Sequence, residues 1–499
     1  MAFSLGYEFF IFAIGLILPR IIILSYGDAV NGLTQTITRL LTLINLIQAG
    51  AVGASIYQMY KPVADGDYKT QSEILYASRK YYSRLGAIYL VIAALISIPY
   101  GFYLAEEDLS AIEIILSFLI LAVNGSIHFF FTSRYDIFFS SHQKRYILTI
   151  SSFAERIAYY VVLFLVVSGN LHFICMYIAH LFGGVARTIV NEIYYRKLAK
   201  GKIDPNPENK NYKIKDRKNL MLNSIGTEMI TAAPTVIITT FIGLAYSSVF
   251  SVYALIYTSM KTIINSVQLS VSAIFGNLVA KAKDEKIARV FNILVYIFII
   301  TGALLASCTA FMIMPFINIY TKGFDSLDYK VPVLAVFVVA YIVVFSVRIV
   351  YAFVSTVYGL FKEMCKLTLT LGAVGVAVST VATILFGMPY VMVGVLLFHA
   401  SYTVSLLLIF KKRIPWFTLK KLPVRLIFLC LMPTISFALY YMNIVKISSF
   451  AQWAVVAVIF ALIVCCILLA YSLIYERKEF FALLSYMKKI VTKKKKAKV

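Results

Sequence analysis

Charged residues are scarce in this chain of 499 residues. Lys, Arg, Asp and Glu together make up 14% of it, whereas about 25% is usual for soluble globular domains. Hydrophobic residues make up 61% of the chain, and they form long continuous runs. Continuous runs exclude a transmembrane β-barrel, whose strands alternate apolar and polar residues. The composition therefore predicts an all-α polytopic membrane protein.

Motifs of common enzyme classes are also absent. The sequence has no Walker A motif, no HExxH motif and no cysteine–histidine spacing of a metal site. Its six cysteines lie within or beside apolar runs without a CxxC pair, which favours small core residues over a disulfide framework. We expect no catalytic residues, no metal site and no cofactor.

Fourteen apolar segments are long enough to cross a membrane, which takes about 20 residues. They are approximately 6–26, 33–57, 84–103, 111–131, 147–168, 172–195, 219–242, 248–279, 289–315, 331–358, 366–386, 389–410, 424–442 and 450–474. We therefore predict about 14 transmembrane helices.

Positive charge lies almost entirely on one side of these segments. With the N-terminus in the cytoplasm, 38 of the 47 Lys and Arg residues fall in cytoplasmic loops and the C-terminal tail. The outer loops carry only Lys322, Lys330 and Lys446. This asymmetry predicts cytoplasmic N- and C-termini. The net charge of +24 then reflects topology and contact with anionic lipids, and we expect no nucleic acid partner.

The basic segment 196–218 divides the chain into two similar halves. Residues Pro19–Ile23, with Gly27 after them, resemble Pro234–Ile238, with Gly243 after them. Such a match six spans apart indicates a parallel repeat with the substrate site between two lobes. We predict an N-lobe of spans 1–6 (1–195), a basic cytoplasmic linker (196–218), a C-lobe of spans 7–12 (219–410), a cytoplasmic loop (411–423), spans 13–14 (424–475) and a basic cytoplasmic tail (476–499).

Two arginines lie inside the first two apolar segments. Arg20 is six residues before Tyr26, where the first segment ends, and Arg39 is six residues after Leu33, where the second begins. At about 1.5 Å per residue, both should lie about 9 Å inside the same membrane face. A guanidinium there costs at least about 2.5 kcal/mol in lipid and should face protein or water. The pair predicts a cavity for an anion, unless the arginines only hold helices together through buried carboxylates or carbonyls.

Several segments resemble one family of membrane proteins. Residues 25–62, SYGDAVNGLTQTITRLLTLINLIQAGAVGASIYQMYKP, are similar to the first helical pair of the polysaccharide transporters. These are the Wzx-like oligosaccharide flippases of the multidrug/oligosaccharidyl-lipid/polysaccharide (MOP) exporter superfamily. Segments similar to later elements of that family follow in order: 141–146 (SHQKRY), 252–257 (VYALIY), 275–278 (FGNL) and 315–323 (PFINIYTKG). The resemblance covers roughly residues 6–413.

This resemblance implies a fold and a function. It implies two pseudo-symmetric six-helix lobes (MATE/MOP-like) around a central cavity, with two extra C-terminal helices outside. It also implies a flippase that moves an undecaprenyl-diphosphate-linked oligosaccharide from the cytoplasmic to the outer leaflet by alternating access, for export of a capsule, exopolysaccharide or cell-wall polymer. The implied location is a bacterial plasma membrane, and the implied partners are membrane lipids and the polymerase and glycosyltransferases of the same pathway.

A diphosphate needs cations, and arginine is suited to forked contacts with phosphate oxygens. The predicted substrate-binding residues, for the diphosphate or sugar, are Arg20, Arg39, Lys261, Arg348, Gln35 and Asn45. Lys261 and Arg348 lie more than about two helical turns from the ends of their segments, where snorkelling is difficult. Gln35 and Asn45 could equally serve hydrogen bonds between helices. Glu228 is expected either to pair with Lys261 or to accept a proton for ion coupling.

Two other functions remain open. An ion-coupled MATE-like exporter of drugs or metabolites would have acidic residues in a lobe cavity and a cationic cargo. A membrane-embedded polysaccharide polymerase or ligase would have a large outer loop with basic and acidic active residues. The excess of intramembrane cations and the short outer loops favour the flippase.

Overall fold

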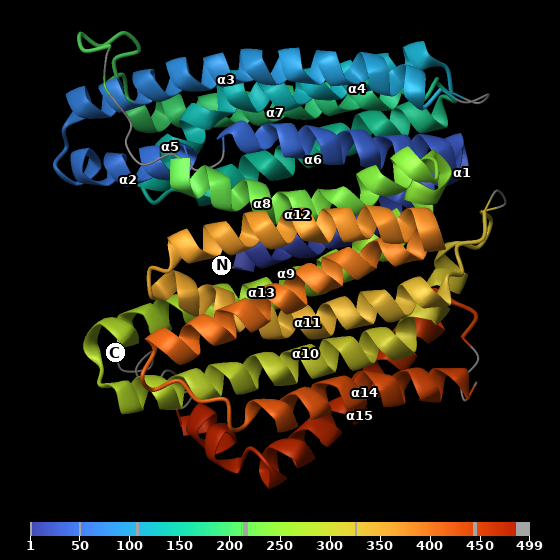
Figure 1. Ribbon diagram of the computed structural model, residues 1–499. Helices are drawn as coiled ribbons and strands as arrows, with labels where there is room; N and C mark the ends of the chain where they lie inside the picture. The colour runs from blue at the N-terminus through green and yellow to red at the C-terminus, as the bar shows by residue number, and fades with distance from the viewer. Residues whose placement is uncertain are drawn as a thin grey trace. The chain divides into compact units, whose positions relative to one another are not determined.

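The computed structural model describes residues 2–48, 51–105, 109–210, 212, 218–324, 327–442 and 447–485, and the regular elements in these ranges are helices (Figure 1). Ten of the described helices are long and apolar enough to cross a membrane. The chain is therefore a multi-pass, all-helical membrane protein, and the count of fourteen spans stays a prediction. Residues 213–217 of the predicted linker and 486–499 of the predicted tail lie outside the described residues.

The chain forms two compact units, Met1–Ser251 and Val252–Val499. The first unit contains α1 (Ala2–Asn45), η1 (Leu46–Gln48), α2 (Ala51–Ala64), α3 (Tyr68–Tyr103), α4 (Ala111–Ile127), η2 (His128–Thr132), α5 (Ser133–Ser141), α6 (Tyr146–Ser168), α7 (Ile174–Ala199) and α8 (Lys218–Phe241). Helix α9 (Leu244–Lys281) begins in the first unit and continues into the second. The second unit also contains α10 (Asp284–Tyr320), α11 (Pro332–Val357), α12 (Phe361–Phe386), η3 (Met388–Tyr390), α13 (Val391–Arg413), α14 (Leu422–Tyr441) and α15 (Phe450–Ile474).

Gly27 divides α1 into two helical arms, residues 2–26 and 28–45. Its φ of 87° and ψ of 173° lie outside the helical region, and glycine tolerates such a positive φ without strain. Near this break the Tyr26 hydroxyl donates to the carbonyl of Leu171 at 3.0 Å, and Thr34 lies 3.0 Å from the Tyr177 hydroxyl. The second arm begins directly after Gly27, and within the first unit α1 packs most extensively against α8. The turn predicted between residues 26 and 33 is a single glycine.

Two predicted segment boundaries are wrong. The segment 33–57 is not one helix, because α1 ends at Asn45 and is followed by η1 and α2. The segment 111–131 continues as a helix to Ser141, through the π-helical turn η2. The charged residues that suggested a loop find partners inside the bundle: Arg134 contacts Glu192 at 3.0 Å and Asp136 lies 3.9 Å from Arg187.

The second arm of α1 is attached to the rest of the first unit along one face. Its apolar residues at helical spacing are at most 8% exposed: Val30, Leu33, Ile37, Leu41 and Ile44. On the two flanks of these apolar residues, Asn31 donates to Ser248 at 2.7 Å, and the Thr36 hydroxyl lies 2.6 Å from that of Thr239. Buried polar residues such as these join membrane helices where a lipid-facing polar group would be costly.

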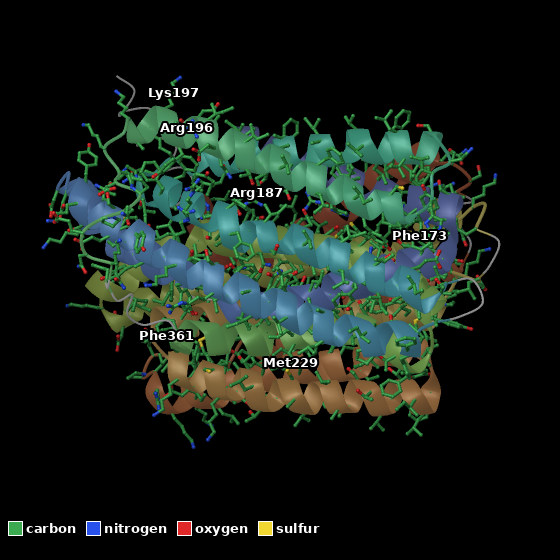
Figure 2. All side chains as sticks on the ribbon, turned by 90° about the horizontal axis from the view of Figure 1, so that it is seen from above. Phe173, Arg187, Arg196, Lys197, Met229 and Phe361 are labelled. Atoms are coloured by element: carbon green, nitrogen blue, oxygen red, sulfur yellow. The ribbon has the colours of Figure 1, made fainter. Side chains whose placement is uncertain are left out.

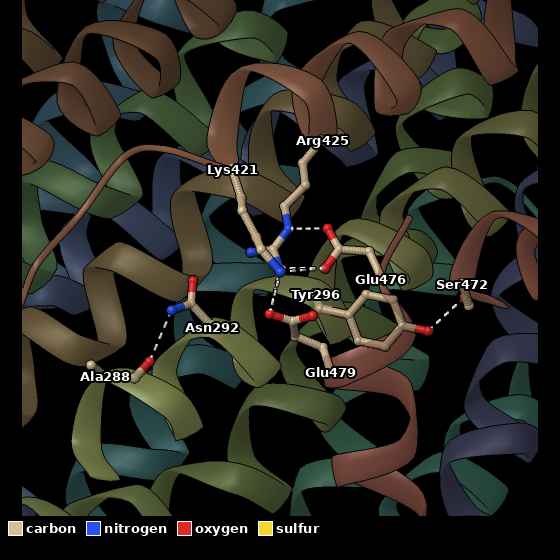
Figure 3. A network of polar contacts seen from close by, with 8 residues as sticks. All are labelled: Ala288, Asn292, Tyr296, Lys421, Arg425, Ser472, Glu476 and Glu479. Atoms are coloured by element: carbon tan, nitrogen blue, oxygen red, sulfur yellow. Dashed lines mark hydrogen bonds and ion pairs between the residues drawn. The ribbon is translucent and has the colours of Figure 1, made fainter. Parts of the chain in front are cut away.

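Helix α10 lies in the core of the second unit, where α11, α14 and α15 pack against it. At one end of α14 the buried Arg425 holds both oxygens of Glu476, at 2.7 and 2.8 Å, and Lys421 donates to Glu479 at 2.5 Å (Figure 3). Tyr296 of α10 donates to Ser472 of α15 at 2.6 Å. This network joins α14 and the end of α15 to α10, at the end of the unit that the charge pattern predicts to be cytoplasmic.

Close packing of α12 against α13 depends on Gly394. A Cβ on this glycine would lie 2.0 Å from the carbonyl oxygen of Gly375 and 2.4 Å from the Ser379 hydroxyl. We expect Gly394→Ala to lower stability by about 1–3 kcal/mol because the helices must move apart. Thermal unfolding of the purified protein in detergent would measure this. Gly276→Ala is the control, since nothing lies within 4 Å of its Cβ position, and equal melting of the two variants would contradict the prediction.

Candidate functional site

A stripe of hydroxyl side chains runs along the second α1 arm beside its buried face. The hydroxyls of Thr34, Thr38 and Thr42 each donate to the carbonyl four residues earlier, at 2.8, 2.7 and 2.7 Å. We call these three residues the α1 ladder. Thr38 is exposed and Thr42 is partly exposed. Because each hydroxyl hydrogen is used within the helix, the ladder offers hydrogen-bond acceptors.

Three predicted site residues lie beside the α1 ladder. Gln35, Arg39 and Asn45 are all partly exposed. Among the described residues, no hydrogen bond or ion pair involves the guanidinium of Arg39, and the side-chain oxygen of Asn45 is buried without a hydrogen-bond partner. A cation inside a membrane span should face water or protein, so this face is suited to a polar, anionic ligand.

Arg20 lies on the other arm of α1 and is partly buried. It precedes Gly27 by seven residues, whereas Arg39 follows Gly27 by twelve. At about 1.5 Å per residue these positions correspond to depths of about 10 and 18 Å from the break. The expectation of equal depth is therefore wrong, because the second arm begins directly after Gly27 and not at Leu33.

Helix α9 repeats the same hydroxyl pattern in the second unit. Thr258, Thr262, Ser266 and Ser270 each donate to the carbonyl four residues earlier, at 2.6 to 2.9 Å. We call these four residues the α9 ladder, and its last three residues are exposed. Lys261 lies next to this ladder, with its nitrogen 5.9 Å from the centre of the Phe345 ring. Each unit thus carries a hydroxyl ladder with a basic residue beside it.

Arg348 of α11 is buried inside the second unit and is only 8% exposed. Its guanidinium carbon lies 4.7 Å from the centre of the Tyr402 ring and 5.4 Å from that of Phe398, both on α13. Its Nε and the Nδ1 of the neighbouring His399 have no hydrogen-bond partner among the described residues. Cation–π contacts offset part of the cost of this burial, and an anion would offset more.

Glu228 lies about midway along α8 and is partly buried. Within the described part of the first unit it makes no hydrogen bond or ion pair. Its pairing with Lys261 and its role in ion coupling stay predictions.

The set of predicted site residues does not include three carboxylates that lie inside spans of the first unit. Glu155 contacts Arg187 at 3.1 Å, and Glu192 contacts Arg134 at 3.0 Å. Asp136 lies 3.9 Å from Arg187. The signal in the sequence was an acidic residue within each apolar helix, but the arginine partners lie 32 to 58 residues away along the chain and could not be assigned from spacing.

Comparisons with known proteins identify the fold. No protein-family model matches the sequence, and no curated protein matches it. An inward-facing multidrug resistance MATE family transporter of the MOP superfamily shares 11% identity over 79% of this chain and 92% of its own, with a TM-score of 0.66. The lipid II flippase MurJ in an inward closed conformation shares 13% identity over 95% of this chain and 99% of its own, with a TM-score of 0.68.

The MurJ match covers a larger share of the chain than the MATE match. The two TM-scores establish the architecture, and sequence identities this low leave the cargo open. The chain therefore has the all-helical fold shared by a MATE transporter of the MOP superfamily and the lipid II flippase MurJ.

Proposed function

We propose that this protein is a flippase that moves a polyprenyl-diphosphate-linked oligosaccharide from the cytoplasmic to the outer leaflet of a bacterial plasma membrane by alternating access. The observation that carries the proposal is the partly exposed polar stripe of α1, where Arg39 lies beside the α1 ladder. A cation would hold the diphosphate, and threonine oxygens would accept hydrogen bonds from sugar hydroxyls.

The second unit supports the same cargo chemistry independently. Lys261 lies beside the α9 ladder, and Arg348 is a buried cation without a carboxylate partner among the described residues. In this proposal Arg20, Arg39, Lys261 and Arg348 bind the anionic part of the cargo, and Gln35 and Asn45 bind sugar. Both ladders would then serve a cargo that combines negative charge with many hydroxyl groups.

An ion-coupled exporter of cationic drugs or metabolites is the second candidate, because the fold is shared with a MATE transporter. Such a cargo needs carboxylates that are open to it. Three described carboxylates inside spans, Asp136, Glu155 and Glu192, are already close to arginines, at 3.0 to 3.9 Å, which leaves Glu228 of α8 as the carboxylate that such an exporter would use. This pairing favours the anionic cargo over the cationic one.

The proposal is tested by deleting the gene and measuring lipid-linked oligosaccharide on each leaflet of the membrane. We expect the oligosaccharide to accumulate on the cytoplasmic leaflet, because its polar head group cannot cross lipid unaided. Complementation with the intact gene should restore the normal distribution. An unchanged distribution in the deletion strain would reject the flippase, and drug susceptibility that follows expression would favour the exporter.

A further inference from the structure

Four ionisable side chains meet inside the first unit, which we call the His128 cluster: His128, Asp136, Glu155 and Arg187. Arg187 donates to Glu155 at 3.1 Å and lies 3.9 Å from one oxygen of Asp136. The Nε2 of His128 lies 3.7 Å from the other oxygen of Asp136. The four side chains are only 17% to 29% exposed. They come from η2, α5, α6 and α7, so no single helix determines the cluster.

The His128 cluster lies at membrane depth. Figure 2 shows Phe173 and Lys197 at opposite ends of α7, with Arg187 between them. Glu155 is nine residues after the start of α6 at Tyr146, which corresponds to about 13 Å along the helix. Ionisable groups at such depth are rare, and in transporters they often relay protons. The π-helical turn that carries His128 is itself a structure enriched at functional sites.

The charges of the cluster are unbalanced by one. Two carboxylates and one guanidinium leave a net charge of −1 while His128 is neutral, and a single proton on His128 makes the cluster neutral. An uncompensated charge is costly away from water, so Asp136 and Glu155 favour a proton on His128, against the opposing effects of burial and Arg187. We propose that His128 binds one exchangeable proton from the cytoplasm and that this proton is coupled to transport. The coupling rests on the proposed transport function, and the proton site does not.

Thr132 lies within hydrogen-bond distance of Nδ1 of His128, the atom that would take up the proton. Its hydroxyl oxygen lies 2.7 Å from Nδ1 of His128 and 3.2 Å from the carbonyl oxygen of the same residue. While His128 is neutral, the hydroxyl donates to Nδ1, and the Nε2–H points to Asp136. Uptake transfers a proton from hydronium to Nδ1, which forms an N–H bond and leaves water. The new Nδ1–H then donates to Thr132, whose hydroxyl turns to the carbonyl.

The other charged groups near the cluster have partners outside it or are exposed. Arg156, next to Glu155 in the chain, lies near His180 of α7. Tyr135, Arg134 and Arg196 surround Glu192. The basic residues of α2 and α3 are exposed: Lys61, Lys69, Arg79, Lys80 and Arg84. On α3, Glu73 accepts a hydrogen bond from Asn209, and the ring of Tyr89 packs on Phe129. On α4, Glu113 caps its own helix at Ser110.

A hollow lies between α5 and α7, toward the basic end of α7. Its volume is about 520 Å³, and it is lined by Phe131, Arg134, Tyr135, Thr188, Glu192 and Arg196 among others. Tyr135 directly precedes Asp136, and Thr188 directly follows Arg187. None of the four cluster side chains lines this hollow, so it borders the cluster without opening onto it. Because Arg196 and Lys197 lie at the end that the charge pattern predicts to be cytoplasmic, protons would enter from that side.

The proton site is tested by nitrogen NMR of the imidazole rings in the full-length protein in lipid nanodiscs. The chain has five histidines, so His128→Gln assigns the signal of His128. We expect this signal to titrate as the pH is lowered. Asp136→Asn should lower the titration midpoint by at least about one pH unit, since the carboxylate that stabilises the imidazolium is gone. A signal that keeps one protonation state, or ignores Asp136→Asn, would overturn the site.

His180 is the matched control. It also lies in a span, stacked on Tyr159 with ring centres 4.0 Å apart, and its signal should not respond to Asp136→Asn. Transport in proteoliposomes then tests the coupling. His128→Gln leaves the Arg187–carboxylate pairs intact and should remove the pH dependence of transport over the range in which His128 titrates. A titrating His128 with unchanged pH dependence in this variant would overturn the coupling while leaving the flippase in place.

Discussion

Replacing Arg425 with methionine is expected to lower the free energy of unfolding by about 3–5 kcal/mol. Arg425 is 2% exposed and holds both oxygens of Glu476, whose side chain is 4% exposed. Without the guanidinium, the buried carboxylate keeps only Lys421, at 3.7 Å. Chemical unfolding of the purified protein in detergent would measure the loss.

Two further variants separate this charge pair from a general effect of losing an arginine. Arg413 pairs with Glu363 at 2.6 Å, but its side chain is 56% exposed, so Arg413→Met should cost at most about 1 kcal/mol. The double variant Arg425→Met with Glu476→Met should be more stable than Arg425→Met alone, because no charge is left buried. Equal losses at Arg425 and Arg413 would show that the buried network contributes little.

The same network should respond to acid. Burial alone would raise the pKa of Glu479, but the hydrogen bond from Lys421 lowers the pKa overall. A carboxyl group with a lowered pKa contributes stability above the usual glutamate value and loses it as the pH falls through the lowered value. We expect the wild type to lose stability in that acidic window, and Glu479→Gln to lose less over the same window. Unfolding curves measured across the range would check this, and parallel pH profiles would contradict it.

Arg39→Gln is expected to reduce transport about ten- to hundredfold. A charge-assisted hydrogen bond to phosphate contributes about 1.5–3 kcal/mol, and each 1.4 kcal/mol corresponds to a factor of about ten. The glutamine keeps a polar side chain of similar reach beside the α1 ladder but removes the positive charge. The measurement is the rate at which lipid-linked oligosaccharide reaches the outer leaflet, at matched protein level.

Charge and shape at this position can be separated. Arg39→Lys keeps the charge and should retain more transport than Arg39→Gln, although it loses the forked contact. Arg79→Gln removes one positive charge from an exposed position on α3 and should leave transport unchanged. Wild-type transport by Arg39→Gln would show that Arg39 only supports the helices.

Much of the fold could be predicted from the apolar runs. The predicted segments 219–242 and 331–358 agree within a residue with α8 and α11. The prediction was wrong where local composition and tertiary contacts disagree. Charged residues after 131 suggested a loop, yet ion pairs with α7 keep the helix intact to Ser141. No local sequence pattern predicted that the helix α1 ends at Asn45.

The site was less accessible from the sequence. Cations inside apolar runs are conspicuous, so Arg39 and Arg348 could be singled out as unusual. The hydroxyl ladders were missed because threonine and serine hardly change the mean hydropathy of a span. The His128 cluster was missed because it assembles from four elements, and only the structure shows that His128 lies near Asp136.

The two ladders have a consequence for how a sugar chain would move. Every ladder hydroxyl already donates within its own helix, so none is left wanting a partner when the surface is empty. A bound glycan would add weak hydrogen bonds to the ladder oxygens without breaking those within the helices, and its release would leave no hydroxyl without a partner. In the proposed function, each ladder would bind the cargo weakly along its whole length, and oligosaccharides of different composition could then move past the same residues.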